Sequence, residues 1–241
     1  MAFLPSTPLT LTGGCHCGAA RYTIAIPALA DRPRIPNALP TPTSATSSIP
    51  ATFPIVTLDH CATCRHTTGA IVTCWFIVPP SWLTWSITTK SGSVLANQPT
   101  VAVVGPRHDT SPPPAKNSTN DENETYVQQY AASPRALRSF CGRCGTNLTY
   151  YNLDRHDTPA AFVDVTVGSL DDGSLAVVRP ERHGWWDSGF GWIREMLRFG
   201  TGEWVIRNPT GDPGRRVGDV EGNGEGKDGA WLEGVRMSDS V

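Results

Sequence analysis

The sequence contains no long hydrophobic run and no cluster of basic residues. None of its apolar stretches approaches the roughly 20 residues that a membrane-spanning helix needs. The segment from Met1 to Pro5 lacks the basic and apolar regions of a secretory signal. Lys and Arg are scattered and the formal net charge is −2, which argues against nucleic acid or an acidic membrane surface as a partner. We therefore expect a soluble, cytoplasmic protein that binds neither nucleic acid nor membrane.

A disulfide framework is also missing. The chain has 241 residues and seven cysteines, an odd number. Most of these cysteines fall into Cys-x-Cys and Cys-x-x-Cys pairs, and such spacings suit a metal ion better than disulfides in a chain of this size. We therefore expect a reducing compartment. The length is enough for one sizeable core, and we expect one domain.

Three stretches lack a hydrophobic period. Residues 27–54 are crowded with Pro, Ser, Thr and Ala, and residues 105–124 contain three consecutive prolines and then a polar run. The tail, residues 208–241, is rich in Gly, Asp, Glu and Arg. Such compositions bury too little apolar area to offset the entropy of ordering the chain. We expect the first two stretches to be surface loop insertions and the tail to be disordered.

The remaining apolar runs are short, rich in β-branched and aromatic residues, and bounded by Gly, Pro or Asp, which predicts strands. These runs are Ala20–Ile26, Ile71–Val78, Thr100–Val104, Asn147–Asn152 and Ala161–Val167. Helix is expected only in a turn or two after Cys64, at Pro134–Arg138 and at Gly191–Phe199. The run Asp171-Asp172-Gly173 marks a turn, for which a hairpin is the simplest explanation. The predicted fold class is therefore mainly β, with few short helices.

Two cysteine pairs, far apart in the sequence, predict one metal site. Cys15 and Cys17 are two residues apart, so on an extended segment their side chains point the same way and can share an ion. Cys141 and Cys144 have the spacing of a zinc knuckle. Buried thiols without a ligand are the alternative, but two chelating pairs flanked by glycine argue against it. We predict a closed, structural zinc site held by these four cysteines.

A third pair, Cys61 and Cys64, has too few cysteines for another closed site. Asp59 lies two residues before Cys61, on the same side of an extended segment, and zinc accepts carboxylate oxygen as well as thiolate. Two thiolates and one carboxylate would leave a fourth position open for chemistry. The alternative is a dithiol whose sulfurs only pack. Both interpretations remain open at this point.

Taken in order, three motifs form a set with a familiar arrangement: Gly14-Cys15-His16-Cys17-Gly18, Cys61-Ala62-Thr63-Cys64-Arg65 and Phe140-Cys141-Gly142-Arg143-Cys144-Gly145-Thr146. This set resembles the family of glutathione-dependent formaldehyde-activating enzymes and the related centromere protein V domain. The resemblance also extends to Val163–Asp171 and Pro180–Trp185. It implies one zinc-binding domain over residues 12–205, interrupted by the two insertions.

The resemblance implies a mainly β, Mss4-like, zinc-stabilised fold. Its structural zinc would be held by Cys15, Cys17, Cys141 and Cys144. A second zinc would be held by a Cys-x-Cys-x-x-Cys motif and serve the reaction of a thiol with an aldehyde, a carbon–sulfur lyase activity. In this sequence Asp59 stands where the first cysteine of that motif belongs. A carboxylate keeps the charge of the site but is a harder donor, so we expect a more Lewis-acidic or less fully occupied zinc.

Several neighbouring residues have two interpretations each. Arg65 either pairs with a substrate carboxylate or is solvated or bonded to the thiolates. His60 leaves an extended backbone on the opposite face, so it is more often a surface histidine than a ligand. Cys74 lies in an apolar strand, where burial is the default. Three further residues either wall a pocket or pack the core: His183, Trp185 and Trp186.

We therefore predict a zinc-dependent enzyme of the carbon–sulfur lyase type. Its substrate would be a small aldehyde, carbonyl compound or thiol adduct, with glutathione or another thiol as partner. The predicted catalytic residues are Asp59, Cys61, Cys64 and Arg65. Two alternatives remain: a pathway-specific lyase, cyclase or isomerase of small-molecule biosynthesis on the same scaffold, and a non-catalytic zinc-stabilised binding module.

Overall fold

The computed structural model describes residues 4–36, 51–106 and 124–199, and the backbone of residues 206–207 and 215–216. The chain forms two compact units, Met1–Asp187 and Ser188–Val241. The second unit contains helix α4 (Gly191–Phe199) and the antiparallel pair β12 (Ile206–Arg207) and β13 (Arg215–Arg216). Helix α4 confirms the helix predicted there. The predicted disordered tail lies almost entirely outside the described residues.

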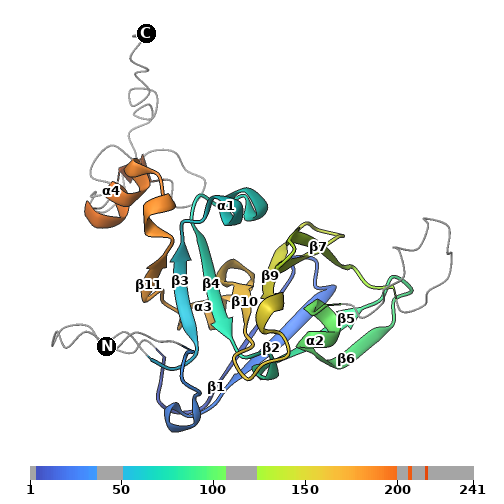
Figure 1. Cartoon of the computed structure of the whole chain (residues 1–241). Coiled ribbons are helices and arrows are strands. Elements are labelled where there is room, and N and C mark those ends of the chain that lie inside the picture. The colour runs from blue at the N-terminus through green and yellow to red at the C-terminus, as the bar shows by residue number, and fades with distance from the viewer. Residues whose placement is uncertain (1–3, 37–50, 107–123, 200–205, 208–214, 217–241) are drawn as a thin grey trace. The chain divides into compact units, whose positions relative to one another are not determined.

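Four antiparallel strands form the first sheet, in the order β1-β2-β5-β6 (Figure 1). Their bounds are Leu9–Gly14 for β1, Ala20–Ile26 for β2, Leu83–Thr88 for β5 and Val94–Pro99 for β6. Strand β2 buries every second residue, as a strand with one face on a core must. This alternation confirms the strand predicted at Ala20–Ile26.

Seven strands form the second sheet, in the order β11-β3-β4-β10-β9-β8-β7. Their bounds are Arg182–Gly184 for β11, Ile55–Asp59 for β3, Thr73–Val78 for β4, Val163–Thr166 for β10, Asn147–Asn152 for β9, Ala136–Cys141 for β8 and Val127–Ser133 for β7. All neighbours pair antiparallel except β11 and β3, which are parallel. The first unit is thus mainly β, as predicted.

The α-helices are short: Ala62–Thr68 for α1, Thr100–Val104 for α2 and Asp172–Leu175 for α3. Single 3-10 turns lie at Leu29–Asp31, Pro80–Trp82, Leu153–Arg155, Val167–Ser169 and Trp186–Ser188. Helix α1 begins between Cys61 and Cys64, and the turn or two predicted after Cys64 is its C-terminal part. Within the described ranges, no helix is long and apolar enough to cross a membrane.

Three local predictions are wrong. Pro134–Arg138 is not helical, because this segment turns β7 into β8 and pairing with β9 holds it extended. Thr100–Val104 is helix α2 rather than a strand; a short apolar run does not distinguish the two, and here Gly105 ends the helix. The turn at Asp171-Asp172-Gly173 begins helix α3 instead of a hairpin.

One face of each sheet contributes to a shared hydrophobic core. In the first sheet the core residues include Tyr22 and Trp85, whose rings meet edge to face with centroids 5.1 Å apart. In the second sheet they include Phe76 and Val165, both fully buried. Burial of apolar area at about 25 cal/mol per Å² makes this core the main source of stability in the first unit.

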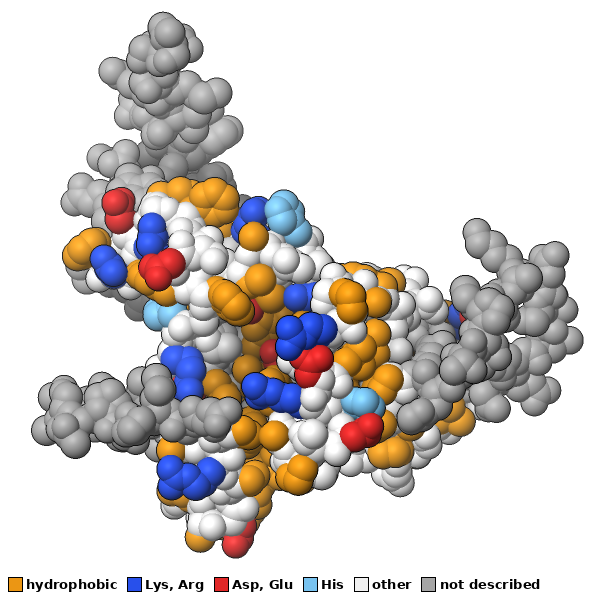
Figure 2. All heavy atoms as spheres, viewed as in Figure 1, with side chains coloured by type: hydrophobic (Ala, Val, Ile, Leu, Met, Phe, Trp, Pro, Cys, Tyr) orange, Lys and Arg blue, Asp and Glu red, His pale blue; other side chains and the backbone are white. Residues whose placement is uncertain are grey.

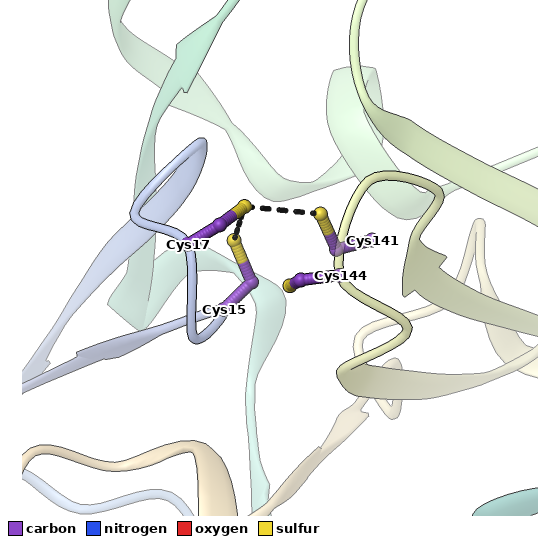
Figure 3. A group of neighbouring side chains, drawn as sticks. All are labelled: Cys15, Cys17, Cys141 and Cys144. Atoms are coloured by element: carbon purple, nitrogen blue, oxygen red, sulfur yellow. Dashed lines mark hydrogen bonds between the residues drawn. The ribbon is translucent and has the colours of Figure 1, made fainter.

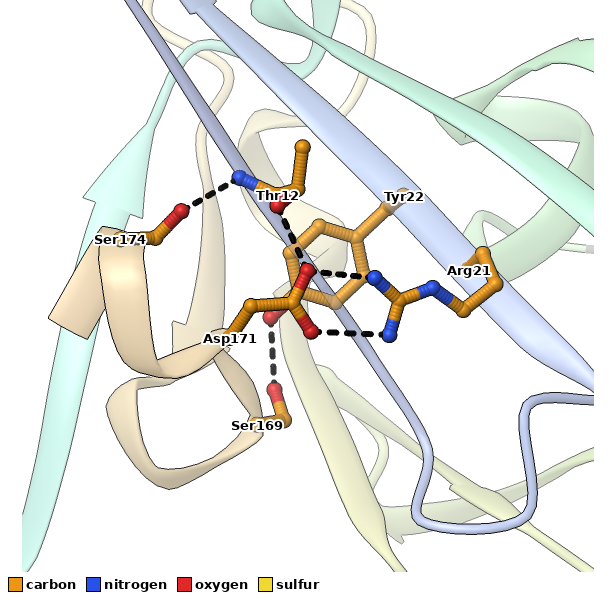
Figure 4. Close-up of polar contacts among 6 residues, drawn as sticks. All are labelled: Thr12, Arg21, Tyr22, Ser169, Asp171 and Ser174. Atoms are coloured by element: carbon orange, nitrogen blue, oxygen red, sulfur yellow. Dashed lines mark hydrogen bonds and ion pairs between the residues drawn. The ribbon is translucent and has the colours of Figure 1, made fainter.

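Hydrogen bonds join the first sheet to the segment around α3 (Figure 4). The carboxylate of Asp171 accepts bonds of 2.9 and 2.5 Å from Arg21 and one of 2.6 Å from Thr12. The Tyr22 hydroxyl lies 2.7 Å from Ser169 Oγ. Thr12 lies on β1, and Arg21 and Tyr22 lie on β2. These bonds fix both strands, and the loop between them that carries Cys15 and Cys17, against α3 and the turn before it.

The opposite face of the seven-stranded sheet is polar and yet buried. Partners across an antiparallel pair share a face, and the register joins Asp59 to Thr73, Arg138 to Tyr150 and Tyr150 to Asp164. Only 7% of Asp59, 2% of Arg138 and 9% of Asp164 is exposed. Figure 2 shows a hollow on the side drawn in Figure 1, over β4 and β10, with acidic and hydrophobic side chains in its depth. Charged side chains that are buried outside the hydrophobic core are candidates for a functional site.

Half of the first predicted insertion and most of the second lie outside the described residues, which exclude 37–50 and 107–123. Within the first insertion the described segments form a short bridge, in which Ile35 N–H donates to Ala51 O at 2.8 Å and Phe53 N–H to Pro33 O at 3.0 Å. Where the second ends, Lys90 N–H lies 2.7 Å from Glu124 O. Backbone hydrogen bonds therefore hold residues 33–35 of the first insertion against residues 51–53, and fix the C-terminal end of the second.

Candidate metal centres

The two distant cysteine pairs come together as predicted. Cys15 and Cys17 lie in the loop between β1 and β2, while Cys141 ends β8 and Cys144 lies in the turn before β9. The Cys17 sulfur lies 3.5 Å from that of Cys15 and 3.7 Å from that of Cys141. All four sulfurs lie within 4.8 Å of one another and converge (Figure 3). Tetrahedral zinc with bonds of about 2.3 Å separates its sulfurs by about 3.8 Å, so the geometry fits such an ion.

The backbone of both loops is shaped to present sulfur. Gly18 and Gly145 have φ values of 76° and 78°, which only glycine adopts without strain. The N–H of each glycine donates a hydrogen bond to the carbonyl oxygen of the first cysteine of its pair, and this bond closes the loop. Ala20 N–H also donates to Cys15 Sγ at 3.2 Å. Donors of this kind stabilise thiolates and orient them toward a metal.

A threonine links the two loops. Thr146 Oγ1 accepts the backbone N–H of His16 at 3.1 Å and lies 3.3 Å from Cys144 Sγ. Burial raises the pKa of Cys141; burial also acts to raise that of Cys144, but hydrogen bonds with Thr146, Cys17 and Cys141 together outweigh it and lower the pKa.

Asp59, Cys61 and Cys64 form a second group of possible ligands. Asp59 ends β3, Cys61 precedes α1 and Cys64 lies within α1. One ligand atom from each lies within 4.8 Å of the other two. Asp59 and Cys64 are buried and Cys61 is partly exposed. Between Asp59 and Cys64 the chain changes from strand to helix, and this change brings the three side chains together.

Two hydrogen bonds hold the Asp59 carboxylate in place. Its Oδ1 accepts the backbone N–H of Cys61 at 2.9 Å, and its Oδ2 accepts the indole N–H of Trp75 at 3.1 Å. Each carboxylate oxygen has a second lone pair, so these bonds leave room for a metal. Metal-binding carboxylates are ordinarily hydrogen-bonded in this way.

The pKa of Cys64 is raised to about 12 by burial and, to a smaller extent, by the neighbouring Asp59, while Arg138 opposes the shift. Without a cation the side chain is therefore a thiol at neutral pH. A metal ion supplies the positive charge that thiolate formation needs. Two sulfurs and one oxygen suit zinc, and three protein ligands leave a position open, so the residues present fit such an ion.

A buried arginine completes this site, and the sequence did not indicate it. Arg138, from β8, donates a hydrogen bond from Nη2 to Cys64 Sγ at 3.2 Å. Its guanidinium lies over the rings of Trp75 and Tyr150, 5.8 and 5.1 Å from their centroids. The segment from Cys141 to Thr146 is also the turn of a hairpin between β8 and β9. A hairpin at this turn pairs Arg138 with Tyr150, and this register was the one signal in the sequence that could have placed Arg138 here.

Arg65, the arginine predicted at this site, follows Cys64 on α1. Its Nη2 lies 3.1 Å from Nε2 of His66, in exposed surroundings. His60 is not the surface residue expected. It is buried, its Nε2 lies 3.1 Å from Nδ1 of His183, and both rings pack on Trp186. His60 is not part of the three-ligand group.

Cys74 lies on the face opposite the reactive groups, and Trp185 is exposed. Cys74 pairs with Leu58, on the face opposite Asp59, and packs against the core, as expected for it. Burial raises its pKa to about 11, so it remains a thiol. Trp185 is 70% exposed, so it neither packs the core nor walls a buried pocket.

No family model matches the chain, and no curated protein matches it. Among solved structures, the chain is similar to the crystal structure of a protein from Rhodobacter sphaeroides. The two share 14% sequence identity over 72% of this chain and 99% of the other, with a TM-score of 0.33.

Proposed function

We propose that the protein is a zinc-dependent enzyme of the carbon–sulfur lyase type, with an Mss4-like fold, that works in the cytoplasm on a small aldehyde, carbonyl compound or thiol adduct. The observation that supports this most is the convergence of Asp59, Cys61 and Cys64 on a buried polar face, separate from the four-cysteine group. Three ligands with a mixed donor set are typical of catalytic zinc, and four thiolates of structural zinc.

In this proposal Cys61 and Cys64 hold zinc by sulfur and Asp59 holds it by oxygen. Zinc bound there supplies Lewis-acid chemistry, lowering the pKa of a bound thiol or polarising a carbonyl. The chain does the rest: the N–H groups of Cys61 and Trp75 orient Asp59, and Arg138 offsets the charge of the Cys64 thiolate.

The reaction joins a thiol to a carbonyl carbon. A carbon–sulfur bond forms as the carbonyl π bond breaks, and the proton that leaves sulfur goes to the carbonyl oxygen. The lyase direction reverses each change. The buried surroundings of Asp59 and Cys64 favour this step, because weak screening strengthens electrostatic stabilisation of the developing oxyanion.

Metal content tests the proposal. Elemental analysis should find two zinc equivalents per chain in the natural protein and one in Asp59→Ala. Cys74→Ser is the matched control, because this cysteine packs on the opposite face, and it should keep both. One equivalent in the natural protein would refute the second site.

Activity is tested with glutathione and formaldehyde. Exchange NMR measures how fast S-hydroxymethylglutathione forms and breaks down, and the protein should accelerate this above the spontaneous rate. If the protein does not accelerate the reaction of formaldehyde but does accelerate that of another aldehyde, the proposed reaction class stands and the substrate is the other aldehyde.

One observation favours a non-catalytic binding module. Both Asp59 oxygens already accept a hydrogen bond, so the carboxylate has a complete structural role without a metal. In that case only the four-cysteine group binds zinc, and the natural protein and Asp59→Ala both contain one equivalent. The same analysis therefore decides between the two functions.

A further inference from the structure

Arg138 has hydrogen-bonding groups that the rest of the chain does not use. Its side chain is 2% exposed, and Nη2 donates to Cys64 Sγ. Nε and Nη1 are buried and have no hydrogen-bond partner among the described residues. An unpaired buried donor costs about 1–3 kcal/mol, and more on a charged group. Such an arrangement is expected where a ligand supplies the acceptor.

The guanidinium is also held in a fixed orientation. It lies over Trp75 on one strand and Tyr150 on another, so the rings restrict its plane and leave its edge available. Nη2 carries two hydrogens, and whichever one bonds the sulfur, the other forms a two-pronged edge with Nη1 or with Nε. A two-pronged edge of this kind matches the two oxygens of a carboxylate.

The surroundings limit the charge of the ligand. Asp164 lies on the same face, across Tyr150 in the strand register, and its Oδ1 is buried without a partner. No ion pair joins Asp164 to Arg138 in the described part of the chain. Burial raises the pKa of Asp164 to about 8, with Asp59 adding to the shift, so its carboxyl group can donate a hydrogen bond at neutral pH. The single guanidinium charge beside the Asp59 carboxylate disfavours a dianion and leaves a monoanion as the better ligand.

We infer that Arg138 binds the carboxylate of a small monoanionic substrate, between Trp75 and Tyr150 and beside Cys64. Because Nη2 lies 3.2 Å from Cys64 Sγ, the first or second carbon beyond the carboxylate lies nearest the thiol pair. The substrate class is therefore a short acid with its carbonyl or sulfur at that carbon. The inference rests on the proposed function in one respect: it takes Asp59, Cys61 and Cys64 as the place where the substrate reacts.

The competing role for Arg138 is to balance the charge of the thiolates without touching substrate. Lysine keeps the charge but has no planar two-pronged edge. A charge-balancing role therefore survives Arg138→Lys, whereas carboxylate binding does not.

The test uses propionate and its neutral isostere propionamide as probes of the zinc-loaded, full-length protein. Saturation-transfer NMR should detect propionate and not propionamide. Arg138→Lys should weaken propionate binding at least about tenfold, the loss expected for a charge-assisted hydrogen-bonded pair, and Arg138→Gln should abolish it. The matched control is Arg135→Gln, an exposed arginine in the turn before β8, which should bind as the natural protein does. Arg65→Gln tests the competing arginine, next to Cys64 on α1.

Equal binding of the two probes, or binding of neither, overturns the inference. So does loss of propionate binding in Arg65→Gln rather than in the Arg138 variants. If Arg138→Gln fails to fold by circular dichroism, the probe comparison on the natural protein and the Arg138→Lys result decide. Zinc content is measured on the same samples: selective propionate binding at one zinc equivalent would refute the proposed function while the carboxylate site stands.

Discussion

The four-cysteine group and the Asp59 group differ in how far apart their parts lie in the chain. The first joins residues separated by 124 positions and connects loops of two different sheets. The second lies within six residues at one strand end and is supported by side chains from neighbouring strands. A distant group constrains the whole chain, whereas a local group can change without unfolding it. The first therefore suits stability, and the second suits chemistry.

Cys141→Ser should have the largest effect, because it breaks the connection between the sheets. The metal site does not exist in the unfolded chain, so metal binding contributes directly to folding. We expect a loss of about 5 kcal/mol or more, comparable with the stability of a whole domain, and an insoluble or molten product. Thermal circular dichroism and sedimentation measure this. A soluble variant that melts like Cys74→Ser would refute the structural role.

Cys64→Ser should separate the two groups. One zinc equivalent and the catalysed exchange should be lost, while the melting temperature changes by only a few degrees, since the four-cysteine site is intact. Zinc analysis, exchange NMR and a thermal melt on one sample give all three results. If fold and activity disappear together, the division between a structural and a reactive group is wrong.

Asp59→Cys should make the second group more like the first. A softer donor tightens zinc binding at unchanged charge, so a chelator competition should show higher affinity and reactivity should move toward glutathione and formaldehyde. The structure adds a cost, because thiolate sulfur is a weak acceptor for the Trp75 indole N–H that now bonds Asp59. We expect the variant with an empty second site and an intact four-cysteine zinc to lose about 1 kcal/mol of stability in urea. Unchanged zinc affinity would remove Asp59 from the ligands.

Two supporting residues should give the smallest effects and the closest comparison. Trp75→Phe removes the donor to Asp59, and Thr146→Val removes the bonds of Thr146 to His16 and Cys144. Each should weaken zinc binding at its own site by about tenfold, the lower end for loss of a supporting bond. Only Trp75→Phe should reduce activity. Equal activity losses would mean that the two sites are coupled.

Local spacing was enough to single out both groups of possible metal ligands, because each pair of cysteines is set by a few consecutive residues. It was enough for most strands too, since alternation in β2 follows from one buried face. It did not predict Arg138, which reaches Cys64 only through the pairing of β8 with β9. Pro134–Arg138 was mistaken for helix for the same reason: its partners lie elsewhere in the chain.

The separation of 124 residues between Cys17 and Cys141 also has a consequence for biosynthesis. At about 5–20 residues per second, the ribosome needs about 6–25 s to deliver the second pair after the first. During that interval Cys15 and Cys17 emerge as free thiols with no partners to complete a metal site. A newly made chain is thus exposed to oxidation at these two residues, and its yield should depend on how reducing the cell is while translation continues.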